Sequence, residues 1–397
     1  MTVPLKISEA RERVLAAVSP LPSEPVALAN ALDRVLAAEL AATTDVPHFD
    51  NSAMDGFAVA PGPSRRLLRI AGESRAGLPA TAPLGPGEAI RISTGAALPL
   101  GAGAVVRVED VVENDGRIVL EVPVAPGENV RRAGEDLRAG TVVLRRGTTL
   151  GPAELAVAVG AGVAKVDVAR RPRVAVLCTG DELREPGVPL GPGEIHNSNQ
   201  IVLAALARKA GAEVVEARAV PDDRDSTERA FADALQRADV VIASGGVSVG
   251  PHDHVKPALA ELGVEESFWR VLLQPGGPTW FGTRGSQLVF GLPGNPVSSH
   301  VTFVLFARPA LLALQGVKQP LPPRGDATLS EPIVRRDRRE RAIPVRLEGT
   351  DTGFRAVPLG LQGSHITSSL SGAAALAFVP PGEGAIDAGG HVEVEPL

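Results

Sequence analysis

Residues 173–314 alternate short apolar runs with helical patterns, and this alternation constrains the fold more than any other feature of the chain. The clearest run, residues 239–243, is apolar and rich in β-branched side chains, which is typical of a strand buried in a parallel sheet. Strands joined by helices form parallel sheets through right-handed crossovers. We therefore predict a mostly parallel α/β sheet domain over residues 171–318.

The individual elements of this domain follow from the same pattern. Strands are predicted near residues 174–177, 214–215, 239–243, 271–273 and 288–290, and helices over 199–210 and 226–238. A long apolar helix is predicted from Pro296 through Leu314, with Asn295 as its N-cap. The start of this helix offers N–H groups to an anion, whereas a plain capped turn is the simpler interpretation of either proline taken alone.

Polar residues and glycines follow three of the predicted strands. They are Thr179-Gly180-Asp181-Glu182, then Asp222, then Ser244-Gly245-Gly246-Val247-Ser248-Val249-Gly250 with Asp253. Because ligands of open α/β sheets bind at the carboxyl ends of the strands, we expect these segments to gather at one edge. The glycines let an anion approach the main chain, and carboxylates beside an anion suggest a bridging divalent cation. A tight turn without a ligand is the alternative for the glycine loop.

The flanking segments predict further β structure and a few helices. Short β-type runs between Gly and Pro residues predict a β-rich domain from Phe57 to about Leu150, and the chain after Pro323 is again β-like. Helices are expected over residues 7–18, 28–40 and 152–159. The polar segment 47–56 is either a site or an Asx-rich turn. The basic run 335–341 is either a solvated hairpin or a ligand clamp.

Composition narrows the functional classes. The chain has 397 residues and a formal net charge of −6, which argues against non-specific nucleic-acid binding. A single cysteine, Cys178, rules out an intramolecular disulfide and fits a reducing cytosol. The first residues lack the apolar core of a signal peptide, and no uninterrupted apolar run is long enough to span a membrane. We expect a soluble cytoplasmic protein that does not act at a membrane.

Five motifs in order resemble the molybdopterin molybdenumtransferase family, the MoeA type, which is related to the C-terminal part of gephyrin. The motifs are Asp50-Asn51-Ser52-Ala53-Met54-Asp55-Gly56, Thr179-Gly180-Asp181-Glu182-Leu183, the glycine loop 244–250, Gly291-Leu292-Pro293-Gly294-Asn295-Pro296 and Gln362-Gly363-Ser364-His365. The resemblance runs nearly from end to end of the chain. One such motif is weak evidence, whereas five in sequence are strong.

The resemblance implies a fold and a reaction. The fold is multidomain α/β plus β: an elongated N-terminal domain (1–55 and 141–170), a β-rich inserted domain (56–140), the α/β molybdopterin-binding domain (171–318) and a small C-terminal β-barrel-like domain (319–397). It also implies a homodimer with shared sites. Molybdate would enter adenylylated molybdopterin with Mg²⁺, releasing AMP. The upstream molybdopterin adenylyltransferase and acceptor molybdoenzymes are the further partners to expect.

The functional residues of the family fall on matching positions of this chain. As catalytic residues the resemblance implies Asp55, Thr94, Glu182, Asp222 and Asp253, of which the last three would hold the metal. As substrate-binding residues it implies Gly245, Gly246, Ser248, Pro293, Pro296 and Ser364, to which we add Arg270 and Gln274. Carboxylates suit this chemistry because a cation must neutralise the charge that develops when a phosphoanhydride is cleaved.

The chain departs from the family at its basic positions. Where the family commonly has two lysines around a Pro-Gly-Lys-Pro element, this chain has Gln274 and Gly277. Arg270 is the nearest cation in sequence, and on a strand it would face the same side as Gln274. An expected C-terminal arginine corresponds to Pro344, with Arg341 and Arg346 as neighbouring substitutes. These changes put the anion site in doubt more than the nucleotide site.

Three other interpretations share the fold, or part of it, but assign a different function. A non-catalytic molybdopterin-binding paralogue or scaffold would have the same fold, and the missing lysines favour it. A hydrolase of nucleotide-like pyrophosphates would use the sheet domain alone, but the Asp55, Thr94 and Ser364 motifs argue against it. His252-Asp253-His254 could form a transition-metal site, although a third ligand is not evident.

Overall fold

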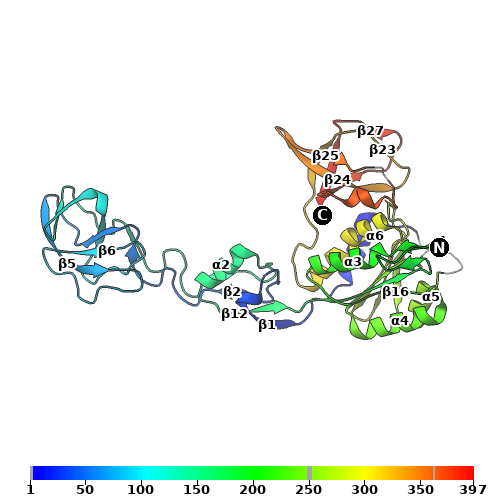
Figure 1. Ribbon diagram of the computed structural model, residues 1–397, viewed down its shortest axis with the longest axis horizontal. Coiled ribbons are helices and arrows are strands. Elements are labelled where there is room, and N and C mark those ends of the chain that lie inside the picture. The colour runs from blue at the N-terminus through cyan, green and yellow to red at the C-terminus, as the bar shows by residue number, and fades with distance from the viewer. Residues whose placement is uncertain (1–2, 248–252, 361–362) are drawn as a thin grey trace.

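The computed structural model describes residues 3–247, 253–360 and 363–397. Figure 1 shows an elongated molecule with a β-rich unit at one end, a slender middle, and an α/β sheet with a C-terminal β unit at the other end. The predicted fold class, multidomain α/β plus β, is confirmed.

The α/β unit is built on a six-stranded sheet. In spatial order its strands are β16 (Glu213–Val220), β13 (Arg173–Thr179), β17 (Val240–Ser244), β21 (Gln287–Leu292), β20 (Trp280–Arg284) and β18 (Glu265–Trp269). The first four are parallel, and the last two are joined antiparallel to the sheet edge. The carboxyl ends of β13, β16 and β17 therefore lie at the same edge, as predicted.

Helices cover both faces of this sheet. One face carries α1 (Ile7–Ala16), α3 (Ser198–Lys209) and the continuous run of α6 (Pro296–Thr302), a π-helical turn (Phe303–Ala307) and α7 (Arg308–Leu314). The other carries α4 (Arg224–Arg237) and α5 (Val255–Glu261). Val174 and Val176 of β13 pack toward the first set, and Ala175 and Leu177 toward the second. Burial on both faces explains why the strand is apolar throughout.

The run Pro296–Leu314 is the one helix of the described residues that is long and apolar enough to cross a membrane. However, 78% of its most apolar window is buried inside the protein. This degree of burial is what the core helix of a globular domain shows.

The C-terminal unit is a small closed barrel. Its strands are β22 (Gly325–Leu329), β24 (Glu340–Thr350), β25 (Gly353–Pro358), β26 (Ala375–Val379) and β28 (His391–Pro396). The ring closes because β24 pairs with both β25 and β26. β19 (Leu273–Gln274) joins it from the α/β segment, by parallel pairing with β24. Short elements complete it: β23 (Ile333–Val334), β27 (Ala385–Ile386) and the 3₁₀ turn η4 (Thr367–Leu370).

The far end is a six-stranded β unit around Phe57, here called the distal sheet. It comprises β4 (Gly56–Val59), β5 (Arg66–Ser74), β6 (Glu88–Ile92), β7 (Ala104–Arg107), η2 (Val108–Asp110), β8 (Val111–Asn114) and β9 (Arg117–Leu120). Two strand pairs and a helix form the slender middle, here called the stalk. They are β1 (Ser23–Ala27) with β12 (Lys165–Ala169), β2 (Leu40–Ala41) with β11 (Val142–Leu144), and α2 (Pro152–Gly160). The short pair β3 (Asn51–Ser52) with β10 (Val130–Arg131) packs against the distal sheet.

Two expected elements are wrong. The helix predicted over residues 28–40 is only a 3₁₀ turn, η1 (Leu28–Asn30), because Asp33 adopts a left-handed φ of 60° and the apolar residues instead fill the stalk core. The strand predicted at residues 271–273 does not join the central sheet. Arg270 before it has a φ of 76°, and only β19 forms, as part of the barrel sheet. The edge strand β18 was not predicted because Glu265, Glu266 and Ser267 hide its apolar pattern.

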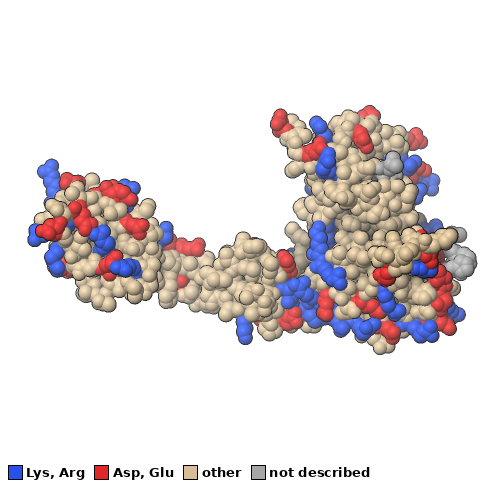
Figure 2. All heavy atoms as spheres, in the orientation of Figure 1, with Lys and Arg blue, Asp and Glu red and all other residues tan. Residues whose placement is uncertain are grey.

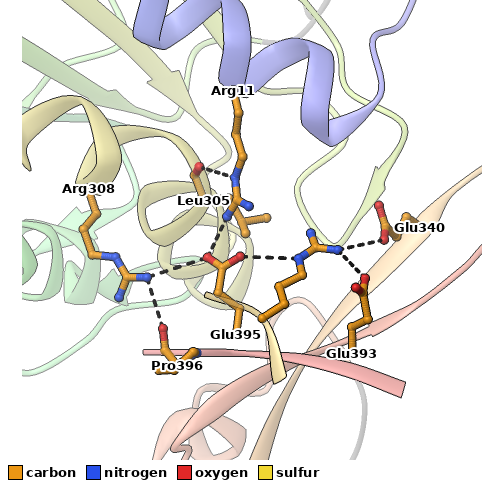
Figure 3. A network of polar contacts seen from close by, with 8 residues as sticks. Arg11, Leu305, Arg308, Glu340, Glu393, Glu395 and Pro396 are labelled. Atoms are coloured by element: carbon orange, nitrogen blue, oxygen red, sulfur yellow. Dashed lines mark hydrogen bonds and ion pairs between the residues drawn. The ribbon is translucent and has the colours of Figure 1, made fainter. Parts of the chain in front are cut away.

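A buried network of charges joins α1, α7 and the barrel (Figure 3). Glu395 of β28 is fully buried, and its Oε1 accepts a 2.6 Å hydrogen bond from Arg11 of α1. Arg308 and Arg324 approach the same carboxylate, each at 3.7 Å. Buried charges persist only when they are paired in this way. The network thus links the N-terminal helix, the sheet domain and the barrel.

Candidate functional site

The predicted polar strand ends line one cavity of about 740 Å³, here called the acidic cavity. Glu182 follows β13, Asp222 follows β16, and Gly245, Gly246 and Asp253 follow β17. The structure therefore brings together the three carboxylates that were predicted to hold a cation. Ser248, which was predicted to bind substrate, lies outside the described residues, as does His252.

Asp222 is positioned by a reciprocal clasp with Asp181. The backbone N–H of Asp222 donates to Oδ1 of Asp181 at 3.0 Å, and the backbone N–H of Asp181 donates to Oδ2 of Asp222 at 3.3 Å. Burial raises the pKa of Asp222, and the negative charges of Asp181 and Glu182 raise it further. The clasp thus places two carboxylates side by side at the carboxyl ends of β13 and β16, where their negative charge would stabilise a cation.

The two glycines of the loop are required by the backbone. Gly245 and Gly246 have φ values of 91° and 63°. A Cβ on Gly245 would lie 2.7 Å from the carbonyl oxygen of Thr179, and one on Gly246 would lie 2.6 Å from Cγ2 of Val255. The N–H of Gly245 already donates to the carbonyl of Leu292 at 3.1 Å, so it does not form part of an anion-binding nest.

Sequence reasoning missed the amide that ties the cavity walls together. Asn199, near the start of α3, donates from Nδ2 to Ser244 Oγ at 2.8 Å and to the Gly294 carbonyl at 2.7 Å. Asn199 is only 8% exposed. Its one indication in the sequence is that it is a polar residue within an apolar helical pattern. Thr179 lies in this cavity wall, at the strand end where it was expected, and its Oγ1 is buried without a hydrogen-bond partner.

The donor chemistry of the acidic cavity fits Mg²⁺. Carboxylate oxygens are its preferred protein ligands, and Mg²⁺ usually keeps several waters while bound to one or two carboxylates and a substrate phosphate. Among residues 3–247, 253–360 and 363–397, no three His, Cys, Asp or Glu side chains converge into a closed metal site. An open arrangement, completed by water and phosphate, is what these carboxylates can provide.

A second cavity of about 290 Å³, here called the basic cavity, lies between the sheet domain and the barrel. Gln274, Pro293, Arg339, Arg341 and Ser364 are among the residues that line it. The basic run 335–341 therefore forms a turn before β24 whose last arginines face a cavity. The run is not a hairpin, because β23 before it pairs with β27, whereas β24 pairs with β19, β25 and β26. That it clamps a ligand stays a prediction.

Gln274 and Arg341 are neighbours across the parallel pair β19–β24. Arg341 donates from Nη1 to the Val334 carbonyl at 2.6 Å, and burial lowers the pKa of its guanidinium. Oε1 of Gln274 is buried without a hydrogen-bond partner. Two half-buried groups with unused hydrogen-bonding capacity therefore meet in this cavity.

Arg270 does not line either cavity. Its left-handed backbone turns the chain before β19, so the alternation that would place Arg270 and Gln274 on one side is absent. Its guanidinium instead stacks on the ring of Trp269, with Cζ 4.3 Å from the ring centroid. The expected substitute Arg346 is paired with Glu348 at 2.5 Å, also away from the basic cavity.

The loop 363–367 connects the two cavities. Nδ2 of Asn295, the N-cap of α6, donates to Ser364 Oγ at 3.1 Å. Pro296 occupies the first helical position, as predicted, and the N–H of Val297 donates to the Ser364 carbonyl at 3.1 Å. Asn295 lines both cavities. A ligand that spans them would therefore pass over this helix start.

Asp55 directly precedes β4 and Thr94 follows β6 in the distal sheet, which lies at the opposite end of the molecule from the α/β sheet and the barrel (Figure 1). The backbone N–H of Thr94 donates to Oδ1 of Asp55 at 2.7 Å. Both side chains are exposed. Within a single chain, Asp55 and Thr94 therefore do not reach the edge of the α/β sheet that carries the acidic cavity.

Cys178 lies in surroundings that make its thiol unreactive. The thiol is buried at the end of β13, and burial raises its pKa to about 12. Because the thiolate is the reactive form, this cysteine remains inert near neutral pH.

Comparison with known proteins gives a consistent picture. Residues 5–162 match the family described as "MoeA N-terminal region (domain I and II)", residues 175–313 the "Probable molybdopterin binding domain", and residues 326–397 the "MoeA C-terminal region (domain IV)". The chain is 37% identical to a molybdopterin molybdenumtransferase of Haemophilus influenzae, over 99% of this chain and 98% of the relative. It is also 37% identical to molybdopterin molybdenumtransferase 2 of Mycobacterium tuberculosis, over 93% and 94%.

A solved structure extends the likeness to the whole fold. The molybdopterin biosynthesis moeA protein of Pyrococcus horikoshii OT3 is 30% identical and covers 100% of both chains, with a TM-score of 0.85.

Proposed function

The chain belongs to the MoeA family of molybdopterin molybdenumtransferases, enzymes of molybdenum cofactor biosynthesis, and from this premise we propose its reaction in detail. Molybdate enters the dithiolene of adenylylated molybdopterin, the phosphoanhydride is cleaved with the help of Mg²⁺, and AMP is released. The observation that carries this proposal is the pair of adjoining cavities. One is lined by carboxylates and the other by arginines, and Asn295 lines both.

The acidic cavity suits the nucleotide end of the substrate. Glu182, Asp222 and Asp253 would hold Mg²⁺, which supplies neutralisation of the charge that develops on the phosphate oxygens. Asp181 keeps Asp222 oriented through the reciprocal clasp. Gly245 and Gly246 leave room for the substrate beside the main chain. Thr179 Oγ1, which has no hydrogen-bond partner, would gain one from the substrate or after a small local movement.

The basic cavity suits molybdate, a dianion. Arg339 and Arg341 provide fixed charge, while Gln274 and Ser364 provide neutral hydrogen-bonding groups. Pro293 and Pro296 shape the loop that separates this cavity from the acidic one. We propose that these arginines replace the lysines that the sequence lacks. The assignment of Arg270 to the anion stays a prediction.

We further propose that the active unit is a homodimer in which the distal sheet of one chain completes the cavities of the other. Asp55 and Thr94 are exposed and far from their own cavities, which supports site sharing. Figure 2 shows few charged side chains over the stalk. Several apolar side chains are exposed there: Leu32, Val142, Val157 and Val159. Exposed apolar surface of this kind commonly marks a protein interface.

We also propose the four-domain division 1–55 with 141–170, 56–140, 171–318 and 319–397. Apolar cores in the distal sheet, stalk, α/β sheet and barrel support it, although Ala342, Leu376 and Phe378 of the barrel also pack in the α/β core. Two elements depart from it: α1, which packs in the core of the α/β sheet, and β19, which pairs with β24 of the barrel.

The test of the reaction is incubation of the protein with adenylylated molybdopterin, Mg²⁺ and molybdate. We expect stoichiometric AMP and a cofactor that activates an apo-molybdoenzyme. Tight substrate binding without AMP release would instead identify a non-catalytic molybdopterin-binding protein.

A further inference from the structure

A third cavity of about 480 Å³ shares no lining residue with the acidic or the basic cavity. Its walls come from α3, from the α6–α7 run, from the end of β28 and from the linker residues Gln319, Pro320 and Pro322. We call it the linker cavity, because these linker residues connect the sheet domain with the barrel. Its volume is within the range of small-molecule sites.

The walls of the linker cavity are largely apolar. The contributing side chains include Leu206, Phe303, Val304, Leu312 and Leu370, together with three prolines. Its ionisable side chains are Lys209, His300 and Arg308, and no Asp or Glu of the described residues lines it. An apolar cavity with a few convergent polar groups is the usual form of a ligand site.

The polar groups of this cavity are poorly satisfied. Nδ1 of His300 and Nε of Arg308 are both buried without a hydrogen-bond partner. Arg308 makes one hydrogen bond, from Nη2 to the Pro396 carbonyl at 3.1 Å, and its distance to Glu395 is a long 3.7 Å (Figure 3). Most buried polar groups in folded proteins are paired. Two nitrogen atoms with unused hydrogen-bonding capacity therefore belong to residues that line this cavity.

The positive charge is only partly balanced: Glu395 lies 3.7 Å from Arg308, and no Asp or Glu of the described residues lines the cavity itself. Burial lowers the pKa of Arg308, although Glu395 acts in the opposite sense. Burial also lowers the pKa of His300 to about 4, and the positive charges of Lys209 and Arg308 add to this effect. Both shifts have the sign that burial of a basic group produces.

We propose that the linker cavity binds a small carboxylate with an apolar body, such as an arylalkanoate. The carboxylate would lie beside Lys209 and Arg308, where a guanidinium can hold two oxygens at once. The apolar body would contact Phe303, Val304 and Leu312, which line the cavity. Phosphate is a poorer match because a strongly hydrated dianion gains little from apolar walls.

Occupancy would hold the barrel against the sheet domain. Leu370 ends η4 and lines the linker cavity, Thr367 at its start lines the acidic cavity, and Ser364 lines the basic cavity. A ligand that fixes this segment would therefore stabilise loops of both other cavities. It should raise the melting temperature by mass action, whether or not the proposed reaction is correct.

The test measures binding of 4-phenylbutyrate, 4-phenylbutanol and inorganic phosphate by calorimetry and ligand-observed NMR. We expect saturable binding of one 4-phenylbutyrate per chain and clearly weaker binding of the uncharged alcohol. Lys209→Gln should weaken the binding of 4-phenylbutyrate about threefold, which is the effect expected when an exposed charge is lost. Leu312→Trp should abolish binding by filling the cavity.

Lys165→Gln is the matched control, because Lys165 is an exposed lysine on β12 of the stalk. It should bind 4-phenylbutyrate like the wild type. The proposal is overturned if the wild type shows no saturable binding, if Lys209→Gln binds as tightly as Lys165→Gln, or if the alcohol or phosphate binds as well as the carboxylate. Because Lys209 is exposed, its variant stays informative even if Leu312→Trp fails to fold.

Discussion

The backbone N–H of Thr94 donates a 2.7 Å hydrogen bond to Oδ1 of Asp55, which joins two predicted site residues across 39 positions of sequence. Asp55 precedes β4 and Thr94 follows β6, and β6 lies at the opposite end of the molecule from the α/β sheet that carries the acidic cavity (Figure 1). Two site residues held together at this distance from the cavity are what a site shared between two chains requires.

Mixed dimers test this sharing. Asp55→Ala and Asp253→Ala homodimers should each lose AMP release, because every site lacks one half. A heterodimer of the two should recover activity, since one of its two sites would receive both native halves. Differently tagged subunits allow the heterodimer to be purified and assayed.

Glu121→Ala is the control for this experiment, because Glu121 is an exposed carboxylate that follows the last strand of the distal sheet. Its homodimer should be fully active. If purified heterodimers of Asp55→Ala and Asp253→Ala remain as inactive as their parents, each chain works alone.

The molybdate dependence of the reaction tests the basic cavity. Arg341→Gln should raise the molybdate concentration for half-maximal insertion about tenfold, since a hydrogen bond to a charged group contributes about 1.5–3 kcal/mol. Gln274→Lys should lower it by adding a charge. Titration is done at saturating adenylylated molybdopterin.

Arg270→Gln separates the two assignments of the anion ligand. Arg270 stacks on Trp269 outside both cavities, so we expect a smaller effect than for Arg341→Gln. A larger effect for Arg270→Gln would restore the assignment made from sequence. Unchanged dependence in all three variants would place molybdate elsewhere.

Glu395 should be a major source of stability for the joint between α1, α7 and the barrel. Glu395→Ala leaves Arg11, whose side chain is only 8% exposed, without its 2.6 Å partner. Breaking a buried pair in this way costs about 3–5 kcal/mol. Glu348→Ala removes an exposed pair with Arg346 and should cost less than about 1 kcal/mol. Urea unfolding of both variants measures the difference, and equal losses would refute the role of the network.

His300 should make stability depend on pH. Its pKa of about 4 lies below the ordinary value of 6.5, so between these values the unfolded chain binds the proton more tightly. Stability should be complete above pH 6.5, fall as the pH drops, and level off below about pH 4. By pH 5 the loss should be about 2 kcal/mol.

Urea midpoints of wild type and His300→Gln between pH 7 and 5 measure this contribution. His300→Gln should show a shallower dependence, whereas His391→Gln, which changes an exposed histidine, should follow the wild type. Parallel curves for wild type and His300→Gln would contradict the expected protonation.

The alternation of strands and helices was sufficient to predict the four parallel strands of the central sheet and the gathering of Glu182, Asp222 and Asp253 at its edge. This succeeded because parallel strands that are buried on both faces leave an unbroken apolar signal. The same logic failed for residues 28–40, where apolar spacing of helical type serves a narrow stalk, and at Arg270, where one left-handed residue breaks the alternation.

Other features depend on contacts between distant segments. Asn199 joins α3 to Ser244 and Gly294, which are 45 and 95 residues away. Arg339 and Arg341 meet Gln274 only because β19 leaves its own domain and pairs with β24. Local periodicity carries no information about such pairings.

The most direct measurement of the central claim is AMP release from adenylylated molybdopterin as Mg²⁺ is titrated, in the presence of molybdate. Wild type and Asp225→Ala, a variant at an exposed carboxylate on α4 outside the acidic cavity, should release AMP with the same Mg²⁺ dependence. Asp253→Ala should fold and dimerise normally yet release almost none at any Mg²⁺ concentration. Normal Mg²⁺-dependent AMP release from folded Asp253→Ala would contradict the assignment of the acidic cavity as the reaction site.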